Sequence, residues 1–218
     1  MKKTFTLLAF TALTCGAFGT SSFAGTLSSA LDKDTHKQGS ELLIKVVSES
    51  EAYQFVQGMT QEGLAFLSDT GLSKAEKRNS FEKLLNNKFD IEAIAKFTAG
   101  RYWKQMNASQ QSEYLNLFED MIVDVYSRRF DEYQGQTVTV KGSTPLNDNE
   151  AIVKSVINQP SGSDVSVDWR VRERGGSMKI LDVIVEGVSM SVTQRSDFSS
   201  VIQRGGGNVD VLLDHLRK

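Results

Sequence analysis

Two carboxylates, Asp182 and Glu186, have the spacing in this chain that best suits acid–base chemistry. They lie two positions on either side of Ile184 in a strand-like segment, so both side chains would project from one face of a sheet. A half-buried Asp182 would have a raised pKa and could serve as a general base, as in cone-shaped isomerases. The alternative is that Asp182 caps a turn or hydrogen-bonds neighbouring backbone. The residues alone leave both roles open.

Other catalytic arrangements are missing from the sequence. The two histidines, His36 and His215, are far apart, so no pair has metal-ligand spacing. The chain has neither a G-x-S-x-G nucleophile elbow nor a G-x-x-x-x-G-K-[ST] phosphate loop. We therefore expect no enzyme activity, no catalytic residue, no metal site and no cofactor.

Three arginines, Arg170, Arg172 and Arg174, alternate along one segment and would form a basic edge near Lys154. Such a run is either a solvated sheet face or a docking surface for an acidic partner or anionic headgroups. The whole chain has 25 basic and 27 acidic residues, a net charge of −2. That balance argues against nucleic acid as a partner, because affinity for nucleic acid depends on neutralising phosphates.

The first residues read as an export signal. Lys2 and Lys3 precede an apolar run, and Ser22-Phe23-Ala24 is a small-x-small cleavage site, so we expect a signal peptide over 1–24. The single cysteine, Cys15, lies inside it and has poor lipoprotein context. The mature chain, 25–218, would be a single exported domain without disulfides.

The helical part is expected over about 40–134. Apolar spacing predicts one long or two short helices over 41–68. Capping boxes at Ser73/Glu76 and Asn107/Gln110, and a cap at Asp90, start three more helices. The helix over 107–133 is the longest and clearest, with a broad apolar face that includes Tyr114, Phe118, Met121 and Val125.

The sheet is expected over about 136–187 as a four-strand antiparallel meander, with Gly175-Gly176 as its last hairpin loop. In the last strand, Leu181, Val183 and Val185 would point one way, and Ile180 and Ile184 the other. Two helices follow over about 190–218. A capping box at Ser191/Gln194 starts the first, and Gly205–Gly207 separates them.

This order predicts an α+β fold with helices gathered on one face of a curved antiparallel sheet. We expect an apolar hollow between the sheet and the 107–133 helix, a common place for ligands. The residues predicted to line it share an inward strand or helix face: Phe97, Leu117, Met121, Val125, Val138, Val140, Val167, Trp169, Val171, Leu181, Val183 and Val185.

Three segments carry a resemblance to a known family. They are Asp182-Val183-x-x-Glu186-Gly187-Val188-Ser189, Thr193-Gln194-Arg195-Ser196-x-Phe198 and, upstream, Ala99-Gly100-Arg101-x-Trp103. The chain resembles the MlaC family, also called toluene-tolerance auxiliary proteins. These are periplasmic phospholipid-carrying components of the ABC transport system that maintains lipid asymmetry. The resemblance implies an NTF2-like or cystatin-like cone with an added helical subdomain.

The resemblance also implies a function. The cavity would hold the tails of a diacyl phospholipid as cargo while the headgroup stays in water. The carrier would be periplasmic and would shuttle lipid between an outer-membrane lipoprotein–porin complex and an inner-membrane ABC transporter with a ring of MCE domains. Two other classes remain open: an NTF2-like enzyme that uses Asp182, and a periplasmic chaperone or lipoprotein carrier.

Overall fold

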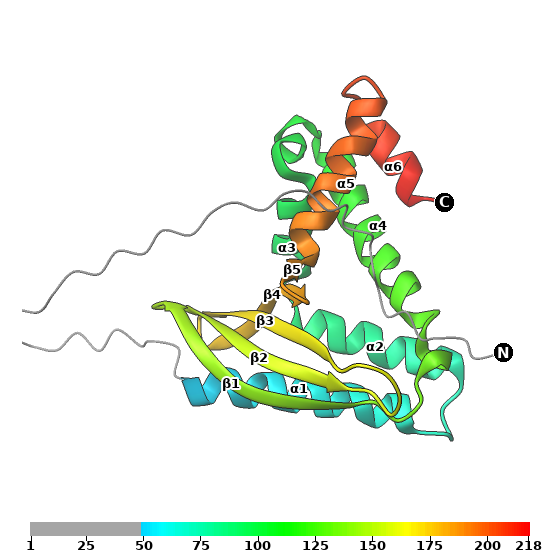
Figure 1. Ribbon diagram of the computed structural model, residues 1–218. Coiled ribbons are helices and arrows are strands. Elements are labelled where there is room, and N and C mark those ends of the chain that lie inside the picture. The colour runs from blue at the N-terminus through cyan, green and yellow to red at the C-terminus, as the bar shows by residue number, and fades with distance from the viewer. Residues whose placement is uncertain (1–48) are drawn as a thin grey trace, which may run out of the picture. The chain divides into compact units, whose positions relative to one another are not determined.

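A computed structural model describes residues 49–218, which form six α-helices, two short 3₁₀ helices and a five-stranded sheet (Figure 1). The signal peptide predicted over 1–24, Cys15, His36 and the start of the first predicted helix lie outside the described residues. None of the helices between residues 49 and 218 has both the length and the apolar character needed to cross a bilayer.

The first half of the described chain is helical. It contains α1 (Glu49–Ser68), α2 (Lys74–Lys88), α3 (Ile91–Ala99), the 3₁₀ helix η1 (Gly100–Gln105), α4 (Ala108–Ser127) and the 3₁₀ helix η2 (Phe130–Glu132). The predicted caps are confirmed. Capping boxes join Ser73 to Glu76 and Asn107 to Gln110, and the Asp90 side chain accepts the Ala93 N–H. The prediction of one helix to residue 133 is wrong, because α4 ends at Ser127.

The second half forms the sheet and two further helices. The strands β1 (Thr137–Asn147), β2 (Glu150–Asn158), β3 (Val165–Arg174), β4 (Ser177–Val185) and β5 (Val188–Ser189) pair antiparallel in chain order. The helices α5 (Met190–Arg204) and α6 (Asp210–Leu216) follow. The cap predicted at Ser191 is wrong: the N-cap is Ser189, whose hydroxyl accepts the Val192 N–H at 3.1 Å.

A two-residue hairpin joins β4 to a fifth strand, which was not expected from the sequence. Val185 pairs with Val188, and the intervening Glu186 and Gly187 have φ angles of 50° and 79°. Positive φ at both central residues is the geometry of a type I′ turn, which suits the twist of paired strands. Glu186 also donates its N–H to the Ser166 carbonyl at 3.0 Å, so the hairpin is held to β3.

A bulge in β4 changes which side chains face inward. Trp169 pairs with Val183 and Val171 pairs with Ile180, so Leu181 is an extra residue between the two pairs. Ile180 therefore shares a face with Val183 and is fully buried. The prediction that Leu181 faces the same way as Val183 and Val185, with Ile180 opposite, is wrong.

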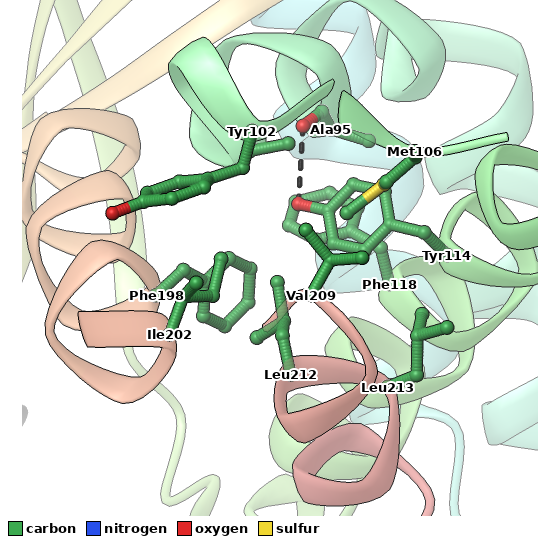
Figure 2. Close-up of a cluster of buried hydrophobic side chains, with 11 residues drawn as sticks. Ala95, Tyr102, Met106, Tyr114, Phe118, Phe198, Ile202, Val209, Leu212 and Leu213 are labelled. Carbon is green, nitrogen blue, oxygen red and sulfur yellow. Dashed lines mark hydrogen bonds between the residues drawn. The ribbon is translucent and has the colours of Figure 1, made fainter. Parts of the chain in front are cut away.

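The helix opposite the sheet is also different from the expected one. In Figure 1, α1 runs along the sheet, and it contacts β1 and β2. The predicted partner, α4, packs instead against α2, α3 and α6. Its buried residues Tyr114 and Phe118 join a second core with α5 and α6, in which the Tyr114 hydroxyl donates to the Ala95 carbonyl at 3.1 Å (Figure 2).

The predicted fold class is confirmed. An antiparallel meander covers a long helix, and a group of helices packs around a core of its own. The two cores are separate because the apolar faces of α1 and α4 point toward different partners.

Candidate functional site

One face of the sheet, here called the inner face, carries a mostly apolar surface. Its register places Val138 beside Ile157, Val167 beside Val185, and Trp169 between Val153 and Val183. Side chains at alternate positions of paired strands share a face, so residues from all four long strands meet there. This is the surface that the predicted site residues of the sheet were expected to form.

The inner face divides into two halves with different environments. The first, here called the buried half, consists of Ala151, Val153, Val171 and Ile180, which are all fully buried. Helix α1 contributes Ala52, Val56 and Met59 to the same core cluster. This half is filled by the protein's own side chains, as in an ordinary core.

The second half remains partly accessible to water. It consists of Val138, Val140, Trp169, Val183 and Val185, each only partly buried although each lies on the inner face; we call this the accessible half. Leaving apolar area in water is unfavourable by about 25 cal/mol per Å². An apolar ligand that covered these side chains would recover that free energy.

A buried serine orients the tryptophan of the accessible half. The Ser155 hydroxyl donates to the Val167 carbonyl at 2.7 Å and accepts the Trp169 indole N–H at 2.9 Å. Both polar groups are thus satisfied without water, and the indole ring is fixed on the inner face. Ser155 was not among the predicted site residues. Its only signal is a hydroxyl at an inward position of an Ile/Val-rich strand.

The structure brings together only some of the predicted lining residues. Seven lie on the inner face: Val138, Val140, Val167, Trp169, Val171, Val183 and Val185. Leu117 and Met121 pack against the helical core instead. Phe97 and Val125 are 41% and 44% exposed, and Leu181 is the bulge residue. The expected hollow between the sheet and the 107–133 helix is therefore a wrong prediction, because α1 occupies the position expected for that helix.

Asp182, the candidate general base, has a structural role. Its carboxylate accepts the Ser189 hydroxyl at 2.5 Å, the Ser191 N–H at 3.0 Å and the Val183 N–H at 3.0 Å. These bonds tie the end of β4 to the first turn of α5. The alternative that Asp182 hydrogen-bonds neighbouring backbone is confirmed. The carboxylate of Glu186 has a different partner and accepts the Ser166 N–H at 2.5 Å.

The predicted basic edge is partly neutralised by a residue that the sequence analysis did not single out. Arg170 and Arg172 each donate two hydrogen bonds to the buried carboxylate of Glu150, at 2.6–2.8 Å. Burial alone would raise the pKa of Glu150, but hydrogen bonds and positive charge from both arginines outweigh it and hold the pKa below its ordinary value. Glu150 and its two arginines therefore act as an ion-paired clamp on the outer face.

A groove of about 460 Å³ lies beside this clamp. Its lining contains basic, acidic and apolar side chains: Arg172, Arg174 and Lys179; Asp90, Glu92 and Glu119; and Phe89, Ile91 and Leu115. Lys179 donates to the carbonyls of Asn86 and Asn87. No group of three or more metal-ligating side chains occurs among residues 49–218. The accessible half of the inner face remains the stronger candidate site.

Comparisons with known proteins identify the family of this chain. The family model described as MlaC protein matches residues 57–218. The toluene tolerance protein ttg2D of Pseudomonas putida is 24% identical over 173 residues, 77% of this chain and 80% of the relative. The intermembrane phospholipid transport system binding protein MlaC of Haemophilus influenzae is 23% identical over 133 residues, 59% of this chain and 61% of the relative.

A solved structure shares the fold. It is a phospholipid-binding protein from Ralstonia solanacearum in complex with a phospholipid, with a TM-score of 0.66 and 24% sequence identity. The match covers 76% of this chain and 94% of the other.

Proposed function

The chain belongs to the MlaC family, and from this premise we propose that it binds a phospholipid by laying the acyl chains against the accessible half of the inner face. The observation that carries the proposal is that Val138, Val140, Trp169, Val183 and Val185 face inward yet remain partly exposed. The name of the Haemophilus influenzae relative and the phospholipid bound in the Ralstonia solanacearum structure support phospholipid as the ligand class.

The energetics suit a carrier. Each methylene removed from water is worth about 0.8 kcal/mol, so free acyl chains cannot cross an aqueous compartment unshielded. Transfer from a bilayer to an apolar protein surface exchanges one apolar environment for another, so loading and unloading are nearly balanced. The direction of transport is then set by partners, and the headgroup remains in water.

The wider role follows the family. The proposed carrier is exported after removal of residues 1–24 and works in the periplasm as one domain over 25–218. It exchanges lipid with an outer-membrane lipoprotein–porin complex and with the MCE-domain ring of an inner-membrane ABC transporter. The bonds made by Asp182 support binding rather than catalysis, because its carboxylate is already engaged with the Ser189 and Ser191 turn.

A pair of matched tryptophan substitutions tests the site. Val185→Trp adds bulk to the accessible half, whereas Val125→Trp adds the same bulk to an exposed position of α4. Val171 is a poor choice because it is fully buried, so a larger side chain would overpack the core. Both variants should stay folded. Lipid extracted from the purified protein and quantified by mass spectrometry should fall several-fold in Val185→Trp and stay unchanged in Val125→Trp. Equal lipid content in the two variants would refute the proposed site.

A further inference from the structure

Exposed apolar and unpaired basic side chains meet where α3 packs against α5. Phe97 on α3 is 41% exposed and Val192 on α5 is 55% exposed. Arg195 lies one helical turn after Val192, on the same side of α5. Arg101 lies in the 3₁₀ helix η1, which begins directly after the end of α3. We call these four residues the Arg195 surface.

The guanidinium of Arg195 is held in place by its surroundings. It stacks on the Phe97 ring at 5.1 Å from the centroid. It also lies against the backbone at Gly100, where a Cβ atom would come within 2.9 Å of the Arg195 Nε. Gly100 has a φ of 57°, which favours glycine. Because Gly100 has no Cβ atom, the Arg195 side chain can lie directly against the backbone at this position.

Neither arginine of this surface has an acidic partner within the described part of the chain. Arg195 stacks on the Phe97 ring and lies against Gly100, and Arg101 donates to the Tyr102 hydroxyl at 2.8 Å while stacking on that ring. In contrast, Arg170 and Arg172 are both bound to Glu150. A fixed guanidinium without a carboxylate can accept one from another molecule with little loss of side-chain entropy.

The composition favours a protein over a membrane surface. Arginine and aromatic residues are enriched at the centres of protein interfaces, and lysine is depleted. Attraction to anionic lipid usually needs clusters of about four to eight basic residues. Here there are two arginines on a chain of net charge −2. Charge complementarity therefore points to carboxylates on the partner, next to an apolar contact.

We propose that the Arg195 surface is a docking site for a protein partner that presents carboxylates around an apolar patch. The inference rests on the proposed function, in which the chain exchanges lipid with protein complexes. The position fits lipid transfer: Val185 of the accessible half pairs with Val188, which is 46% exposed and leads directly into α5. A partner docked here would lie beside the end of the proposed acyl-chain surface.

Charge reversal at one arginine tests the docking site. Arg195→Glu is compared with Arg204→Glu, a matched change at an exposed position in the last turn of α5. Arg195→Gln provides a second variant that removes the charge without adding a new one. The probes are the purified MCE-domain ring and the purified lipoprotein–porin complex of the same organism. The dissociation constant for at least one probe should rise about tenfold in Arg195→Glu and stay within about twofold in Arg204→Glu.

Three further readouts make the result specific. Lipid content should be unchanged in Arg195→Glu, and a loss would assign Arg195 to lipid binding and overturn the docking proposal. Affinity of the unmodified chain should weaken with added salt, and less so for Arg195→Gln. Unchanged affinity for both probes would refute the proposal. Binding to vesicles of phosphatidylglycerol and phosphatidylethanolamine is measured in parallel. If Arg195→Glu weakens binding to these vesicles but to neither protein probe, the proposal is also refuted. If the unmodified chain carries no lipid but binds a protein probe in the way that depends on Arg195, the proposed function is contradicted and the docking site is not.

Discussion

The Asp182 carboxylate accepts the backbone N–H of Ser191 at 3.0 Å, which links the end of β4 to the first turn of α5. Between these residues lies the Glu186–Gly187 turn. The short connection places the accessible half of the inner face beside the helix that carries Arg195. The proposed lipid-binding surface and the proposed docking surface therefore meet at this corner of the fold, where β4 turns into α5.

Removal of the Asp182 carboxylate should weaken this corner. In Asp182→Ala, the Ser189 hydroxyl and the Ser191 N–H both lose their acceptor, and unsatisfied partly buried donors cost about 1–3 kcal/mol. The free energy of unfolding measured in urea should fall by about 2 kcal/mol. Asp182→Asn, which retains one acceptor oxygen, should cost less. A negligible loss in Asp182→Ala would contradict the structural role.

The ion-paired clamp should make stability depend on pH. The pKa of Glu150 is lowered in the folded chain, so its charge stabilises the fold above the ordinary value of 4.5. That contribution is lost as the pH falls through the lowered pKa. The free energy of unfolding should therefore drop between about pH 5 and pH 3 more steeply in the unmodified chain than in Glu150→Gln.

A matched variant on the same face controls for this prediction. Asp168→Asn also removes one carboxylate from the outer face, beside Lys154 in the register. It should keep the steep acid dependence, while Glu150→Gln should be less stable at neutral pH by about 1–3 kcal/mol. Identical acid profiles for the unmodified chain and Glu150→Gln would rule out the clamp as a source of pH dependence.

The bulge in β4 predicts unequal costs for neighbouring truncations. Ile180 is fully buried beside Val171, so Ile180→Ala should lower the free energy of unfolding by about 2–5 kcal/mol. Leu181 is only partly buried, so Leu181→Ala should cost less than half as much. Equilibrium unfolding of both variants decides the register. A larger loss in Leu181→Ala would restore the simple alternation expected from the sequence.

Local signals correctly predicted three helix starts and the loop between β3 and β4. The Ser73/Glu76 and Asn107/Gln110 boxes are short-range patterns that satisfy the first free N–H groups of a helix, and both are present. The Gly175-Gly176 loop likewise joins β3 and β4 as expected. These features depend on residues a few positions apart, so the sequence contains the information directly.

Features that depend on distant contacts could not be predicted in the same way. Strict alternation placed Leu181 inward, but an extra residue in one strand reverses the alternation without leaving a sequence mark. The apolar faces of α1 and α4 are similar in pattern, so periodicity could not tell which one covers the sheet. Seven of the predicted sheet residues consequently share the inner face, whereas Leu181 and the predicted residues of α3 and α4 lie elsewhere.

The positions of the two tryptophans give the most direct test of where acyl chains bind. Trp169 lies on the accessible half of the inner face, and Trp103 packs against the helical core. Each can be observed alone in Trp103→Phe and Trp169→Phe, loaded with a phospholipid whose acyl chains carry bromine, a contact quencher of indole fluorescence. The proposed site predicts strong quenching of Trp169 and little change at Trp103, relative to the same lipid without bromine. Equal quenching of both, or quenching of Trp103 alone, would contradict it.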